Sequence, residues 1–190
     1  MSDDFSQGPM SRRMLSMPVL HIDANLINSR QKLSAVNQLE KWAEDDVILI
    51  NMSGTARDEA KAGGSEQRNR KADKQIYTVT PSIEAGDPVY EQVEKALFPT
   101  GTRSANQQND VKIVAEASKY QAILVTADGA SNSQPGGILG NRDKVKGLVT
   151  IVSPTEAVEL VKRKILERDN FNRQVAREYK LDLPSWTGID

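Results

Sequence analysis

Four acidic residues stand at the ends of short elements that the sequence predicts, in four separate parts of the chain. Asp23 directly follows the first predicted strand, and Asp128 closely follows a later one. Glu59 lies on a short predicted helix after the second strand, and Asp110 opens the helix that leads into the strand before Asp128. Because ligands of parallel α/β sheets bind beyond the carboxyl ends of the strands, we expect these acids to line one pocket.

The chemistry that such a pocket favours is metal-assisted hydrolysis. Converging carboxylates repel one another and do not all stay ionised without a cation. Their combined charge suits one or two Mg²⁺ or Mn²⁺ ions, which prefer oxygen ligands. These ions generate a nucleophilic hydroxide from bound water and stabilise the charge that develops on a phosphodiester.

Each acid also has an ordinary structural interpretation. Asp23 and Asp110 suit helix N-caps, and Asp128, which precedes a glycine, suits a turn. Glu59 suits a solvated helix face, and its neighbour Asp58 is an equal candidate by spacing alone. Taken one at a time, each acid favours the structural interpretation.

Composition excludes several other kinds of site. The chain has no cysteine, so it has no zinc–thiolate site and no cysteine nucleophile. Its only histidine, His21, lies within an apolar run, which favours a core or edge position over catalysis. No apolar run reaches the roughly 18 residues of a membrane span. The net charge of −1 means that any nucleic-acid binding depends on a local basic face.

Short apolar runs alternate with helical patterns along the chain. The predicted strands are 19–22, 47–51, 76–80, 122–126 and 148–152. The predicted helices are 25–44, 55–62, one capped by Asp87-Pro88, 111–119, and a long one that begins at Ser153-Pro154-Thr155-Glu156. Residues 99–109 and 129–140 are predicted loops. This alternation predicts an α/β fold with a central, mainly parallel sheet.

Three segments resemble motifs of the PIN-domain nuclease family. Residues 21–27 (HIDANLI) resemble its opening strand, in which Asp-x-Asn follows hydrophobic residues. Residues 109–117 (NDVKIVAEA) look like its third acidic position, and residues 123–128 (ILVTAD) look like its strand followed by Thr-x-Asp. Glu59 falls where the family places a glutamate after the second strand. The resemblance spans about residues 18–153.

The resemblance implies a PIN-like three-layer α/β/α sandwich and Mg²⁺- or Mn²⁺-dependent cleavage of single-stranded RNA, with DNA as a further candidate substrate. The catalytic and metal-binding residues would be Asp23, Glu59, Asp110 and Asp128, supported by Asn25 and Thr126. It also suggests the toxin of a toxin–antitoxin pair, with an antitoxin or other protein partner, and a homodimer. The first residues show no convincing signal-peptide pattern, so we expect a reduced, cytoplasmic setting.

Beyond this core, we expect a disordered tail over residues 1–17, a nuclease domain over 18–167 and a helical extension and tail over 168–190, in which Trp186 packs back on the domain. The Gly- and Ser-rich segment 129–140 is longer than the family leads us to expect. Asp143 after it is either a further ligand or a surface acid.

A local run of basic residues offers a weak nucleic-acid signal. They are Arg68, Arg70, Lys71 and Lys74, joined by Arg57, Lys61 and Arg103. They form either a face for a phosphate backbone or a solvated segment.

Two other functions remain open. One is a catalytically inactive PIN-fold module that binds RNA or protein. The other, which the order of the acids disfavours, is a receiver-like signalling domain.

Overall fold

The computed structural model describes residues 10–29, 33–62, 66, 70, 73, 78–129 and 135–190. Short strands alternate with helices along this part of the chain, as the apolar patterns predict. The strands are β1 (Leu20–Ile22), β2 (Ile50–Ser53), β3 (Val79–Thr80), β4 (Ile123–Val125) and β5 (Thr150–Val152). The helices are α1 (Ala24–Ser29), α2 (Ser34–Glu44), α3 (Gly54–Lys61), α5 (Pro88–Leu97), α6 (Ala105–Lys119), α7 (Gly137–Gly140), the 3₁₀ helix η1 (Arg142–Val145) and α8 (Pro154–Tyr179).

The strands form one five-stranded sheet in the order β3-β2-β1-β4-β5, and every pairing in it is parallel. The carboxyl ends of all strands therefore meet at one edge. A receiver domain has its strands in the order 2-1-3-4-5, so this topology excludes the receiver-like alternative.

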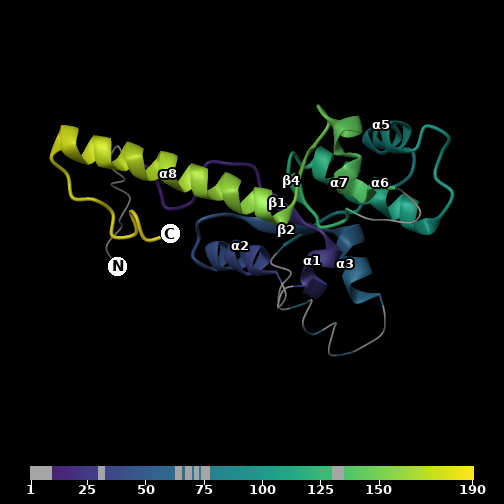
Figure 1. Cartoon of the computed structure of the whole chain (residues 1–190), viewed down its shortest axis with the longest axis horizontal. Coiled ribbons are helices and arrows are strands. Elements are labelled where there is room, and N and C mark those ends of the chain that lie inside the picture. Colours follow the sequence, from purple (N-terminus) through teal and green to yellow (C-terminus); the bar gives the residue numbers. More distant parts are fainter. Residues whose placement is uncertain are drawn as a thin grey trace.

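Helices cover both faces of the sheet. On one face α2 and α8 pack against it, and on the other α3, α5 and α6 do so. Within β4, Ile123 and Val125 pack on the face covered by α2 and α8, whereas Leu124 packs on the face covered by α3, α5 and α6, as the alternation of a strand requires. The architecture is thus the predicted three-layer α/β/α sandwich with a central parallel sheet (Figure 1).

Two predicted helix starts are confirmed by their hydrogen bonds. Asp87 caps α5 by accepting from the Val89 N–H, with Pro88 at the first helical position. Ser153 and Glu156 form a capping box at the start of α8, in which each side chain accepts from the other residue's backbone N–H. These local patterns were sufficient to place both helices.

Three predicted boundaries were wrong. Helix α6 begins at Ala105, capped by the Ser104 side chain, so residues 105–109 are helical and Asp110 lies inside the helix. The single helix predicted over 25–44 is described as two helices, α1 and α2. Strand β2 begins at Ile50, three residues later than predicted. The predicted strand at 76–80 is described only from residue 78. Of the predicted loop at 129–140, residues 130–134 lie outside the described residues, and Gly137–Gly140 form helix α7 instead of loop.

The predicted loose tail is packed where the structure describes it. Leu15 is buried in the core beside α2 and α8, and its N–H donates to the Val47 carbonyl. Ser11 donates its N–H to the Asn172 side chain on α8. Residues 10–17 are therefore part of the fold, and residues 1–9 lie outside the described residues.

The C-terminal extension continues α8 and then turns back along it (Figure 1). Arg168 on α8 is buried, and its guanidinium bonds to Asp169 and Asp190. The same guanidinium lies 4.4 Å from the centre of the Trp186 ring, so Trp186 packs back as predicted. In the part of the chain that is described, no helix is long and apolar enough to cross a membrane.

Candidate functional site

The carboxyl edge of the sheet contains the point at which strand order reverses, between β1 and β4. Ligands of open α/β sheets bind outside the strand ends at such a switch point. Asp23 follows β1 there, and Thr126 follows β4. The topology therefore places two of the predicted site residues at the expected position of a binding crevice.

Asp23 is 4% exposed and sits at the centre of a hydrogen-bond network. Its Oδ2 accepts from the Thr126 hydroxyl at 2.6 Å and from Asn25 Nδ2 at 2.9 Å. Asn25 Nδ2 also lies 3.2 Å from Thr126 Oγ1. Asn25 and Thr126 thus contact Asp23, in the place that the sequence assigned to supporting residues.

Burial raises the pKa of Asp23 to about 6. The Thr126 hydrogen bond opposes this rise, while the charges of Glu59 and Asp128 add to it. An acid that ends a buried strand is thus held close to two others, in an environment that disfavours its ionised form.

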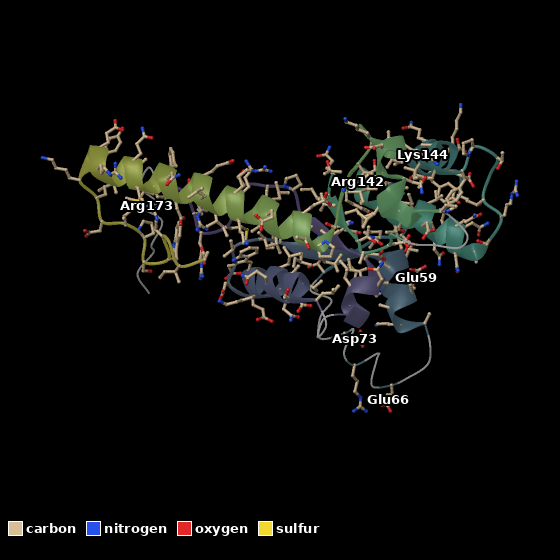
Figure 2. The ribbon with its side chains drawn as sticks, viewed as in Figure 1. Glu59, Glu66, Asp73, Arg142, Lys144 and Arg173 are labelled. Atoms are coloured by element: carbon tan, nitrogen blue, oxygen red, sulfur yellow. The ribbon has the colours of Figure 1, made fainter. Side chains whose placement is uncertain are left out.

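Glu59 is the acid that α3 directs into the site. It is half-buried, and its Oε1 accepts from Asn109 Nδ2 on α6 at 2.6 Å, so it lies where α3 meets α6 (Figure 2). Burial raises the pKa of Glu59, and the Asn109 hydrogen bond lowers it. The alternative, Asp58, is exposed and pairs with Arg57 at 2.8 Å. The geometry therefore favours Glu59 over Asp58.

Asp110 lies in the second turn of α6 and is half-buried. Burial is the largest cause of the rise in its pKa to about 7, followed by the charges of Asp128, Glu59 and Asp23. All three other predicted acids thus act on Asp110. We call Asp23, Glu59, Asp110 and Asp128 the acidic cluster, because the fold brings these four together.

Asp128 also bonds to helix α7, a contact that the sequence did not predict. Its Oδ2 accepts from the Ile138 N–H at 2.9 Å, and its backbone carbonyl accepts from the Leu139 N–H at 2.9 Å. A Cβ added to Gly137, whose φ is +55°, would lie 2.5 Å from Asp128 Oδ1. Asp128 therefore holds helix α7 beside the site through these two bonds.

The acidic cluster has no basic counterpart among the described residues. Within that part of the chain, none of its four carboxylates pairs with a lysine or arginine. Nor, over the same residues, is any group of three acidic or histidine side chains arranged so that it could hold a metal ion as it stands. The cluster therefore has the donor chemistry of a divalent-cation site, but its side chains are not gathered around one point.

Other candidate residues lie away from this chemistry. Asp143, the possible further ligand, is exposed on η1, and its neighbours Arg142 and Lys144 lie apart from Glu59 in Figure 2. His21 is 2% exposed, and burial lowers its pKa to about 4, so it is the core histidine that the sequence favoured.

The predicted basic run is only partly described. Arg68, Lys71 and Lys74 lie outside the described residues. Arg70 pairs with Glu66, and Lys61 pairs with Asp73, each at 2.5 Å. Arg57, Lys61 and Arg70 thus have local acidic partners, as in a solvated segment.

No family model matches this sequence, and no curated protein does. Solved structures that are similar to it include a chain in a crystal structure of VapBC2 from Rickettsia felis bound to a DNA fragment from their promoter. That chain is 15% identical, the match covers 71% of this chain and 98% of that one, and the TM-score is 0.48. A chain in the structure of FitAB bound to an IR36 DNA fragment is 17% identical, with coverage of 72% and 94% and a TM-score of 0.46. Both likenesses concern the fold alone.

Proposed function

We propose that this protein is a metal-dependent endoribonuclease of the PIN type, which hydrolyses phosphodiester bonds in single-stranded RNA. The observation that supports the proposal most strongly is the acidic cluster at the switch point of the sheet. Asp23 and Asp110 both have raised pKa values; the charges of Glu59 and Asp128 contribute to both, and that of Asp23 to Asp110. A cation between these groups would relieve their repulsion.

The donor set fits Mg²⁺ or Mn²⁺, because every side chain of the cluster offers carboxylate oxygen. Asp23, Glu59 and Asp110 would hold the ion, and Asp128 would join them to the extent that α7 releases its carboxylate. When bound there, such an ion would supply a nucleophilic hydroxide and offset the charge that develops on the phosphodiester.

The residues around Asp23 have a distinct part in this proposal. Thr126 and Asn25 both donate to the same oxygen, Oδ2, of Asp23. These two bonds hold one oxygen of the carboxylate in place and so favour a single rotamer of the Asp23 side chain. Hydrogen-bonding partners of this kind orient metal ligands and tune their basicity.

A specific observation favours a second candidate, a PIN-fold module that binds RNA or protein without cutting. In the described part of the chain, no three acidic side chains are gathered for a metal as they stand, and Asp128 is occupied by α7. Catalysis thus requires side chains of the cluster to turn toward a common point, whereas binding alone does not.

One assay separates the two candidates. Purified protein is incubated with single-stranded RNA in Mn²⁺ or Mg²⁺, and the reaction is repeated with EDTA, with Asp23→Asn and with the exposed control Asp143→Asn. The nuclease proposal predicts cleavage that EDTA and Asp23→Asn abolish and that Asp143→Asn retains. Intact RNA after incubation with folded wild type, over several sequences and both metals, would favour the binding module. A parallel arm with single-stranded DNA defines the substrate.

The proposal extends to a toxin that acts in the cytoplasm, as a homodimer or with an antitoxin partner. Induced expression in a bacterial host tests this part. The wild type is expected to arrest growth and Asp23→Asn is not. Normal growth with abundant, active wild-type protein would remove the toxin proposal and leave the nuclease proposal intact.

A further inference from the structure

Helices α3 and α6 are joined side by side through two polar contacts. The Thr55 hydroxyl on α3 donates to Glu116 Oε1 on α6 at 2.7 Å. Asn109 Nδ2 on α6 donates to Glu59 Oε1 on α3 at 2.6 Å. Residues one or two helical turns apart lie on the same side of a helix, so Thr55 and Glu59 share a face of α3, and Asn109 and Glu116 share a face of α6. The two contacts thus lie one after the other between antiparallel helices. We call the pair the α3–α6 ladder and each contact a rung.

The Thr55–Glu116 rung is the contact of the ladder in which both residues are buried. Glu116 is fully buried, and its Oε1 also accepts from the Ile83 N–H at 3.1 Å, which ties in the segment after β3. Thr55 is 8% exposed. A buried hydrogen bond to a carboxylate is costly to break, so this rung fixes how α3 sits along α6.

The Asn109–Glu59 rung lies at the site itself. Asn109 precedes Asp110, so one turn of α6 supplies one acid of the cluster and binds another. Glu59 has a long side chain, is half-buried and lies near the negative charges of Asp23 and Asp110. Without a donor, repulsion from these charges favours rotamers that point the Glu59 carboxylate away from the cluster.

We propose that Asn109 is a positioning residue of the acidic cluster, which holds the Glu59 carboxylate beside Asp110 while the Thr55–Glu116 rung keeps the two helices in register. The inference rests on the proposed function, since it assigns Asn109 a role in gathering ligands for a divalent ion. Hydrogen-bonding partners of metal ligands typically contribute 10- to 100-fold to metal affinity. Asn109 touches neither ion nor substrate and acts through Glu59.

The test compares Mn²⁺ binding by calorimetry in wild type, Asn109→Ala and the matched control Asn106→Ala, an exposed position on the same helix. We expect Asn109→Ala to weaken Mn²⁺ binding about tenfold and Asn106→Ala to leave it unchanged. In a Glu59→Gln background, Asn109→Ala should add no further loss, because the residue through which it acts is already altered. Asn109→Leu, which keeps the side chain's size, repeats the measurement, and circular dichroism verifies the fold of each variant.

The possible results distinguish failure of the Asn109 positioning role from failure of the proposed nuclease function. Equal Mn²⁺ affinity in wild type and both Asn109 variants would overturn the positioning role while the metal site stands. A loss of the same size with and without Glu59→Gln would also overturn it, because Asn109 would then act by another route. Absence of Mn²⁺ binding to folded wild type would overturn the proposed function, and the role of Asn109 with it.

Discussion

Replacement of Asp110 by asparagine should stabilise the metal-free protein at alkaline pH. Asp110 has no basic partner among the described residues, and the charges of Asp128, Glu59 and Asp23 all act on it. Asparagine keeps the size of the side chain and removes its charge. The variant therefore relieves desolvation and repulsion at one position of the acidic cluster.

The magnitude follows from the pKa. Burial and the neighbouring charges raise the pKa of Asp110 from its ordinary 3.8 to about 7. At about 1.36 kcal/mol for each pKa unit, this corresponds to a ceiling of about 4 kcal/mol. Asp110 is only half-buried, so solvent screening reduces the gain to roughly 1–2 kcal/mol.

The pH dependence has a defined sign. Folded protein keeps a proton on Asp110 up to about pH 7, whereas the unfolded chain releases it near pH 3.8. The wild type's free energy of unfolding therefore falls as the pH rises through this window. Asp110→Asn lacks the titrating group, so its advantage is complete above about pH 7 and vanishes toward pH 4.

Urea unfolding followed by tryptophan fluorescence measures this difference, in EDTA at pH 8 and pH 4.5. The control is Asp143→Asn, an exposed acid outside the cluster, which should change the unfolding free energy by less than about 0.5 kcal/mol. If Asp110→Asn is no more stable than wild type at pH 8, then the acids do not share one repulsive site, and the reasoning behind the metal centre is refuted.

Three further predictions concern the same region. A Cβ at Gly137 would clash with Asp128, and the backbone there has a positive φ, so Gly137→Ala should lower the free energy of unfolding by about 1–3 kcal/mol and reduce cleavage. The control Gly140→Ala has open space for its Cβ and should leave the free energy of urea unfolding unchanged. Thr55→Val removes a donor to buried Glu116, and we expect it to lower the unfolding free energy by about 1–3 kcal/mol; an unchanged value would remove the anchor from the α3–α6 ladder. Saturating Mn²⁺ should raise the wild-type melting temperature, by an amount equivalent to about 2.7 kcal/mol at one hundred times Kd, and a flat response in scanning calorimetry would contradict the cation site.

The sequence by itself was sufficient for features that depend on neighbouring residues. Apolar runs and caps predicted the alternating strands and helices, because β1, β4 and the starts of α5 and α8 need only local patterning and capping bonds. The same patterns placed Asp23 and Asp128 after strands, and the parallel sheet then brought both to one edge.

Tertiary structure decided what depends on contacts between distant residues. Asp58 and Glu59 are equivalent by spacing, and only the position of α6 turns Glu59 inward, onto Asn109. Asp110 suits an N-cap locally, yet Ser104 starts the helix earlier and leaves Asp110 as a member of the cluster. The bond from Ile138 to Asp128 and the packing of Leu15 against α2 and α8 link segments with no shared local pattern. These features depend on burial and on charges from distant parts of the chain, and a short stretch of sequence carries no information about either.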